Sequence, residues 1–176
     1  MFYKLMAKLL EYPEEDLLTA IPTIKPALQT LPELECTVIG EFLKGLTAQE
    51  LTETQANYVQ AFDMTPEHAL HLTHHIFGDD KNRGPALIDL TEYYKQYGLE
   101  LAANDDSSNE LPDYLPLVLE FAAQLEPEAA HIFLSQWNKV LNQLASNLEK
   151  TDSTYAPLLR LVAQRSSLVQ PQEAIA

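Results

Sequence analysis

Glu110-Leu-Pro-Asp-Tyr-Leu-Pro-Leu-Val-Leu-Glu-Phe121 places two prolines, two acids and a tyrosine at the start of an apolar segment. Proline has no backbone N–H to donate, but it is favoured in the first turn of a helix. The apolar residues after Pro112 recur at helical spacing, so we expect a helix that starts near Pro112 and buries one face. The stretch therefore predicts an α-helical fold with an acidic segment at the mouth of one helix.

The acidic character extends to both sides of this stretch. From Gln96 to Asn138 the sequence holds eight acidic residues and neither Lys nor Arg, and the net charge of the chain is −15. Such a surface repels nucleic acid and anionic membranes and suits a basic, amphipathic partner. A charged, solvated surface without a dedicated partner explains the same composition. The charge thus argues against nucleic acid binding and leaves the partner open.

Length and cysteine content limit the architecture further. A chain of 176 residues is long enough for one domain with its own core, or at most two small ones. The single cysteine, Cys36, excludes disulfides within the chain and a Cys-rich metal site. The apolar N-terminal stretch 1–12 is interrupted by charges at helical spacing and is expected to be a structural helix, not a signal peptide. We expect a cytoplasmic protein without stable membrane insertion.

Apolar residues recur every three or four positions along nearly the whole chain, which is the pattern of amphipathic helices. No segment alternates with period two, and no repeat of solenoid length is present. The sequence predicts one all-α domain, a helical bundle over residues 1–165, and a tail at 166–176 that frays. A loop is expected at 99–110, which is rich in Asn, Asp and Ser.

Prolines, glycines and capping residues predict where the helices begin and end. Pro13 is expected to open a helix, and Pro22, Pro26 and Pro32 to cut the following segment into short pieces. Thr47-Ala-Gln-Glu50 has the form of a capping box. Other expected starts and stops are Thr65-Pro66 to Gly78, Gly84 or Pro85 to Gly98, Pro127 to Leu148 without a break, and Asp152 or Ser153 as the cap of the last helix.

Histidines offer a candidate metal site. His71 and His75 are four apart, a spacing that can chelate zinc on a helix, with Asp79 or Glu67 as a third ligand. No glutamate follows His71, so the zinc-protease motif is missing and nothing fixes the third ligand. We favour exposed or capping histidines and expect no metal, no cofactor and no catalysis. A metal-dependent helical enzyme using His71 and His75 is the alternative.

Arginine and aromatic residues in the middle of the chain have two interpretations. Arg83 either ties carbonyls or a carboxylate together between helices or contacts a partner. The aromatic residues, which include Tyr58, Phe62, Tyr94 and Tyr114, either pack in the core or line a groove that binds a helix.

Several segments, in this order and spacing, resemble the nitrate reductase assembly chaperones of the NarJ type, or delta subunits, within the wider group of redox-enzyme maturation proteins. The similar segments are Leu9-Leu-Glu-Tyr-Pro13, Tyr58-Val-Gln-Ala-Phe-Asp63, Arg83-Gly-Pro-Ala-Leu87 and Glu110-Leu-Pro-Asp-Tyr-Leu-Pro-Leu117. The resemblance covers about residues 1–165. Many members carry His where this chain has Tyr114, so a pH-dependent role of that position does not carry over.

The resemblance implies an all-helical chaperone without catalysis. Such a protein binds the N-terminal amphipathic segment of the apo catalytic subunit of respiratory nitrate reductase, supports insertion of its molybdenum cofactor and delays its docking at the membrane. A chaperone for another molybdoenzyme, or a helical scaffold without a groove, are the alternatives, and either a monomer or a weak or domain-swapped dimer is expected. The predicted peptide-binding residues are Tyr58, Phe62, Asp63, His75, Arg83, Tyr94, Glu110, Leu111, Pro112, Asp113, Tyr114 and Leu115.

Overall fold

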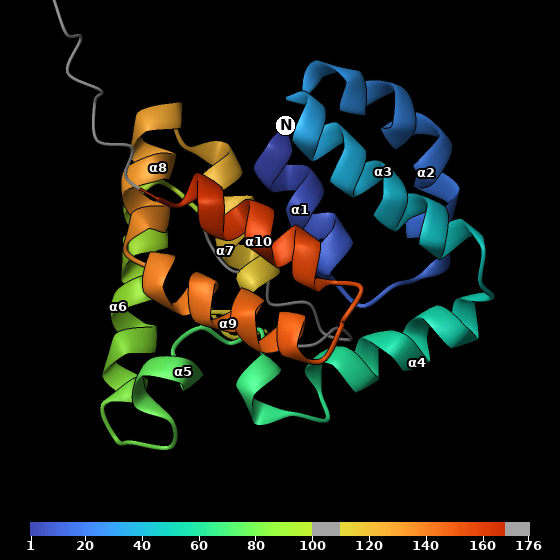
Figure 1. Ribbon diagram of the computed structural model, residues 1–176. Coiled ribbons are helices and arrows are strands. Elements are labelled where there is room, and N and C mark those ends of the chain that lie inside the picture. Colours follow the sequence, from blue (N-terminus) through green and yellow to red (C-terminus); the bar gives the residue numbers. More distant parts are fainter. Residues whose placement is uncertain (100–109, 168–176) are drawn as a thin grey trace, which may run out of the picture.

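The computed structural model describes residues 1–99 and 110–167, which form a bundle of α-helices (Figure 1). Within these residues no β-strand occurs, and the one strand-like feature is an isolated bridge between His71 and Tyr114. The predicted all-α fold is confirmed. The loop predicted at 99–110 and the tail predicted at 166–176 fall largely outside the described residues, so the boundary of the domain stays a prediction. Ser166 itself is buried and donates to the carbonyl of Ala163.

Two close helix pairs build the centre of the molecule. Helix α1 (Phe2–Leu10) packs along α7 (Leu115–Gln124), and α9 (Asn138–Lys150) packs along α10 (Ala156–Arg165). Their apolar faces are the stripes expected from the sequence, and most of these side chains are fully buried. The buried side chains of these four helices belong to one continuous hydrophobic core, to which the other helices also contribute side chains.

Helices α2 (Glu15–Ala27), α3 (Glu33–Thr47) and α4 (Leu51–Phe62) flank this core on one side, at the right of Figure 1, with the short 3-10 helix η1 (Leu28–Thr30) between α2 and α3. The prediction that Pro22 and Pro26 cut this region into pieces was wrong, because α2 continues through both. Both prolines lie on the exposed face, where water can bond the carbonyls that lose an N–H partner. The break expected at Pro32 is confirmed, since Pro32 precedes the first residue of α3.

Two predicted helix starts in this region were also wrong. Helix α2 begins at Glu15 rather than at Pro13, whose carbonyl instead accepts a hydrogen bond from Gln55 Nε2 at 3.0 Å. Thr47 does not cap α4, because it is the last residue of α3 and its hydroxyl donates to the Lys44 carbonyl at 3.0 Å. Helix α4 begins after Glu50 without a capping side chain.

The helix predicted from Thr65 to Gly78 is broken in the structure. A 3-10 helix, η2 (Pro66–His68), is followed by an extended segment and by the short helix α5 (His74–Phe77). The extended segment pairs with residues 113–115, which also delays the start of α7 from the expected Pro112 to Leu115. Helix α6 (Arg83–Gln96) follows as expected. The stops at Gly78 and Gly98 are confirmed, since both adopt positive φ, at +55° and +73°.

The long helix predicted from Pro127 to Leu148 is two helices, α8 (Pro127–Ser135) and α9. At the junction, Gln136 and Trp137 donate to carbonyls three residues back, which tightens the last turn and redirects the chain. Before α10, the hydroxyl oxygen of Ser153 accepts a 3.3 Å hydrogen bond from the backbone of Tyr155, so Ser153 and not Asp152 supports the last helix start.

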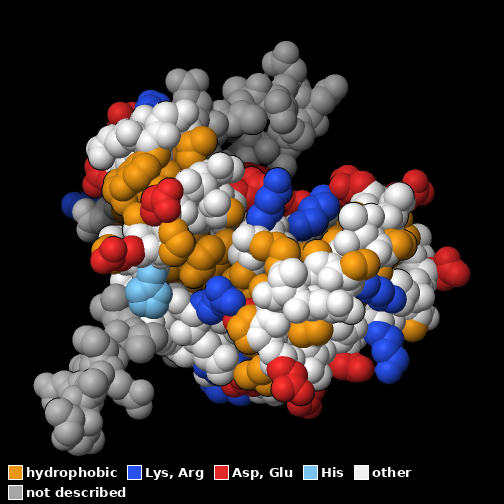
Figure 2. Space-filling model, turned by 90° about the horizontal axis from the view of Figure 1, so that it is seen from above, with side chains coloured by type: hydrophobic (Ala, Val, Ile, Leu, Met, Phe, Trp, Pro, Cys, Tyr) orange, Lys and Arg blue, Asp and Glu red, His pale blue; other side chains and the backbone are white. Residues whose placement is uncertain are grey.

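On the face shown in Figure 2, acidic side chains are spread among basic and hydrophobic ones rather than gathered in one patch. In the part of the chain that the structure describes, no helix is both long and apolar enough to cross a bilayer.

Arg165 is expected to contribute measurably to the stability of the bundle. Its guanidinium donates to both carboxylate oxygens of Glu35, at 2.6 and 2.8 Å, and lies 4.1 Å from the ring centre of Phe2. Replacing Arg165 by Ala leaves the Glu35 carboxylate, which is only 9% exposed, without its partner. Arg165→Ala should lower the free energy of unfolding, measured by urea denaturation, by about 1.5–3 kcal/mol.

The control for this experiment is Lys44→Ala. Lys44 pairs with Glu41 at 3.5 Å on an open surface, and removing an exposed pair changes stability by about 0–1 kcal/mol. Equal losses for the two variants would contradict a structural role of the Arg165 pair.

Candidate functional site

Two distant segments meet beside α5 and position the candidate site. The backbone N–H of Leu72 donates to the carbonyl of Asp113 at 3.0 Å, and that of Leu115 to the carbonyl of Leu70 at 2.8 Å. These bonds form the antiparallel bridge between His71 and Tyr114. The pairing fixes the acidic segment in front of α7 against the segment that joins η2 to α5.

Asp113 is the buried centre of this arrangement. Its carboxylate accepts hydrogen bonds from the backbone N–H of Thr73, at 2.9 Å, and from the Thr73 hydroxyl. His71 Nδ1 lies 3.4 Å from one carboxylate oxygen, and Arg83 Nη2 lies 3.7 Å from the other. Burial alone would raise the pKa of Asp113, but the hydrogen bonds from His71 and Thr73 outweigh it and lower the pKa. Asp113 is therefore an ionised group that holds three neighbours in place.

Arg83 and His71 contact the Asp113 cluster and also reach the surface of the protein. Arg83 Nε donates to Thr73 Oγ1 at 3.0 Å, which agrees with the predicted role of Arg83 as a tie between segments. His71 Nε2 lies 3.9 Å from the carboxylate of Glu110, and the His71 ring lies 5.4 Å from that of Tyr114. The half-buried side chains around Asp113 thus include a histidine, an arginine and a glutamate.

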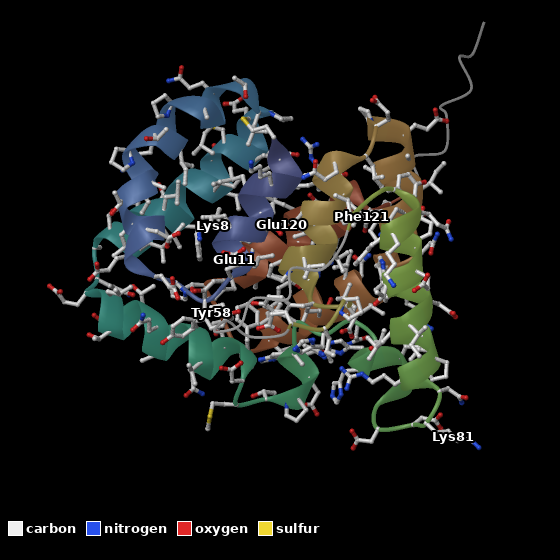
Figure 3. All side chains as sticks on the ribbon, turned by 180° about the vertical axis from the view of Figure 1, so that it is seen from behind. Lys8, Glu11, Tyr58, Lys81, Glu120 and Phe121 are labelled. Atoms are coloured by element: carbon white, nitrogen blue, oxygen red, sulfur yellow. The ribbon has the colours of Figure 1, made fainter. Side chains whose placement is uncertain are left out.

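Tyrosine hydroxyls join this cluster to α1 and α6. Tyr58 donates to the carbonyl of Leu10 at 3.1 Å, so the Tyr114 hydroxyl, 3.0 Å away, donates to Tyr58. Tyr94 donates to the carbonyl of Pro112 at 2.7 Å. Burial raises the pKa of Tyr114 to about 12 and raises that of Tyr58 and Tyr94 as well, so all three stay protonated donors at neutral pH. Figure 3 shows Tyr58 turned from α4 toward the body of the molecule, whereas Lys81 points away from the turn before α6.

The predicted site residues divide into two groups by exposure. Those with buried side chains are Tyr58, Phe62, Tyr94, Pro112, Asp113 and Leu115. Those that reach the surface in part or fully are Asp63, His75, Arg83, Glu110, Leu111 and Tyr114. The buried group can position the site, whereas the second group can touch a partner.

His71 and His75 do not form the helical pair that was considered as a candidate metal site. His71 precedes α5 in the extended segment, so His71 and His75 do not share a helical face, contrary to the prediction. His75 Nε2 donates to the carbonyl of Ala69 at 2.7 Å, and burial lowers the pKa of His75, so its ring is a neutral structural donor. Among residues 1–99 and 110–167, no group of three His, Cys, Asp or Glu is placed to hold a metal ion.

An apolar groove adjoins the cluster and shares Thr73 with it. The groove has a volume of about 310 Å³ and lies between α5, α6 and the junction of α8 with α9. Trp137 is one of the lining residues, and its Nε1–H group is buried and finds no acceptor in the described part of the chain. The lining residues are Thr73, Ile76, Phe77, Ala86, Asp89, Leu90, Tyr93, Phe133, Gln136 and Trp137.

Sequence reasoning missed this groove. The break between α8 and α9 turns Trp137 toward α6, and no proline or glycine marks that break. The one signal was the tryptophan itself, since a single Trp among ordinary core residues is often an anchor at an interface.

Comparison with known proteins gives a consistent assignment. The model of the family described as nitrate reductase delta subunit matches residues 24–160. The nitrate reductase molybdenum cofactor assembly chaperone NarJ of Escherichia coli K12 is 32% identical over 98% of this chain and 72% of its own length. A Bacillus subtilis protein assigned as the same chaperone is 30% identical over 98% of this chain and 92% of its own.

A solved structure supports the fold. A protein from Archaeoglobus fulgidus, proposed to be a redox enzyme maturation protein, superposes with a TM-score of 0.63 over 92% of this chain and 90% of its own, at 24% identity. The relatives are named as assembly chaperones and not as enzymes, which agrees with the expectation of no catalysis.

Proposed function

Because the chain belongs to the nitrate reductase delta subunit family, we propose that it is a chaperone for the catalytic subunit of respiratory nitrate reductase. It binds the N-terminal amphipathic segment of the apo-subunit, supports insertion of the molybdenum cofactor and delays docking at the membrane. It acts in the cytoplasm as a non-catalytic partner and is released from the finished enzyme.

The observation that carries the proposal is the apolar groove beside the Asp113 cluster. Aromatic and aliphatic side chains line it, and Asp89 is the charged residue on its wall. An amphipathic helix inserts its apolar face into such a groove, and acidic residues around it attract the basic face. The net charge of −15 adds long-range attraction for a basic segment.

The predicted site residues fit this role in two ways. Asp113, Tyr58 and Tyr94 hold the paired segments, so they fix the shape of the groove wall through Thr73. Leu111, which is 39% exposed, and Glu110 stand at the surface of the same segment and can contact the helix as it leaves the groove.

A peptide that copies the N-terminal segment of the catalytic subunit should bind with a change in Trp137 fluorescence. Trp137 is the only tryptophan of the chain, so its emission reports on the groove alone if the peptide contains none. Ile76→Asp should weaken binding, measured by calorimetry and fluorescence, by at least about tenfold, because it places a charge in the apolar wall. The affinity should also fall as salt is raised, since the rim charges are screened.

The matched control is Ile132→Asp. Ile132 is 53% exposed, as is Ile76, but it lies on α8 outside the groove. Its variant should bind like the unaltered protein. Equal weakening by both variants would place the peptide elsewhere, and tighter binding of the targeting segment of another molybdoenzyme would reassign the partner.

A further inference from the structure

The groove at Trp137 lies between two helical walls. The wall on α6 consists of four residues that are three or four positions apart and therefore share one face of the helix. They are Ala86, Asp89, Leu90 and Tyr93. The opposite wall, at the junction of α8 with α9, has the same spacing in Phe133, Gln136 and Trp137. From Ala86 to Tyr93 the wall is about 10 Å long, so it matches about two turns of a docked helix.

The two walls meet at the Tyr93 end of the groove. The ring of Tyr93 stacks on the ring of Phe133, with ring centres 5.7 Å apart and ring planes only 9° from parallel. Both residues line the groove, so their stacked rings join one wall to the other. A helix that lies along α6 therefore meets an aromatic stop at Tyr93, which limits how far the helix can shift in that direction.

Asp89 is the one charged residue among those that line this groove, and it lies one turn before Tyr93. Its side chain is exposed, and its carboxylate has neither a hydrogen bond nor an ion pair with any other described residue. The cations on the same helix are already engaged, since Arg83 pairs with Asp113 at 3.7 Å and Lys95 pairs with Glu92 at 2.7 Å. The charge of Asp89 is therefore accessible to a cation of a partner.

We propose that Asp89 sets the register of the docked segment by pairing with one particular Lys or Arg at the edge of its apolar face. That cation lies about one turn from the side chain that contacts Tyr93, and a shift of the docked helix by one turn, about 5.4 Å, separates the two charges. The net charge of −15 attracts every basic residue of a partner alike, whereas Asp89 distinguishes one of them. This inference rests on the proposed function, because it takes the N-terminal amphipathic segment of the catalytic subunit as the occupant.

The test is a charge-reversal scan with the peptide that copies this N-terminal segment. Each Lys or Arg of the peptide is replaced in turn by Glu, and calorimetry measures its binding to the unaltered protein and to Asp89→Lys. Asp89→Lys should bind the original peptide at least about fivefold more weakly, because the ion pair is lost and two like charges face each other. One Glu-substituted peptide, and no other, should bind Asp89→Lys at least about fivefold more tightly than it binds the unaltered protein.

Glu53→Lys is the matched control for the change in net charge. Glu53 is exposed, has no ion pair with another described residue and lies on α4, on the opposite side of the molecule from α6 (Figure 1). Charges separated by more than about 8 Å are largely screened at physiological salt, so Glu53→Lys should change the affinity for each peptide by less than about twofold. Asp89→Asn keeps the shape of the side chain, and its affinity for the original peptide should lie between those of the unaltered protein and Asp89→Lys.

Equal weakening by Asp89→Lys and Glu53→Lys overturns the inference, because the charge of Asp89 then acts only through the net charge. Rescue of several peptides by Asp89→Lys, or of none, overturns it as well, since no single register is then selected. In these cases the loss of binding in Ile76→Asp still supports the proposed function, because the peptide occupies the groove. A peptide that does not bind the unaltered protein overturns both.

Discussion

Asp113→Ala is expected to lower the free energy of unfolding by about 3–5 kcal/mol, because it removes one partner of a buried charged network. Without the carboxylate, the backbone N–H and hydroxyl of Thr73 lose their acceptor, and Arg83 loses its opposite charge. Urea denaturation measures the change. Asp63→Ala, at an exposed position just after α4, should change stability by less than about 0.5 kcal/mol and serves as the control.

Asp113 should also make the stability of the protein depend on pH, and the direction of its pKa shift determines the sign of this dependence. Folding lowers the pKa of Asp113, so its contribution is fully present above the pKa of the unfolded chain, near 3.9. The contribution is lost as the pH falls through the lower pKa of the folded state. The stability of the Asp113→Ala variant should therefore depend less on pH in this acidic range, and parallel profiles for the two proteins would contradict an ionised Asp113.

Phe62→Ala is expected to cost about 3–5 kcal/mol through the cavity that it leaves in the core. Phe62 is 3% exposed and packs against Tyr58, with ring centres 4.9 Å apart, and against Tyr155, at 4.8 Å. It thereby joins the end of α4 to the start of α10. Thermal and urea unfolding should both show the loss, whereas Leu34→Ala, 61% exposed on α3, should stay within about 0.5 kcal/mol.

This result bears on how peptide binding is tested. A Phe62→Ala protein that binds the peptide poorly has partly lost its fold. Its weak binding therefore does not show that Phe62 contacts the peptide. Tyr58→Phe is the better variant for Tyr58, because it keeps the ring and removes only the hydroxyl that bonds Leu10 and Tyr114. A Phe62→Ala variant as stable as the unaltered protein would show that Phe62 is not part of the core.

Helix positions could be predicted from the sequence wherever the apolar pattern decides them. The stripes of α1, α3 and α10 are regular, and glycines with positive φ end the helices before residues 79 and 99. The errors lie where a distant contact overrides local preference. The pairing of residues 70–72 with 113–115 breaks one predicted helix and shortens another, and no local pattern encodes a partner some forty residues away.

The candidate site could be predicted in part for the same reason. The composition of the segment from Glu110 to Tyr114 marks it as a candidate, and Arg83 is one of the few cations, in a turn between two predicted helices. Their relation to Thr73 was not predictable, because Thr73 lies in a segment that looked helical. The burial of Asp113 was equally hidden, since a carboxylate beside prolines is usually exposed.

The bridge between His71 and Tyr114 also closes a ring of chain that contains α5, α6 and the acidic stretch before residue 110. The entropy lost on closing such a ring rises only with the logarithm of its length. Residues added between Gln96 and Glu110 therefore change the charge and length of this segment at little thermodynamic cost. The bridge between His71 and Tyr114 keeps its geometry. Length can thus vary between the end of α6 and Glu110, whereas α5 and α6 themselves line the groove and fix its shape.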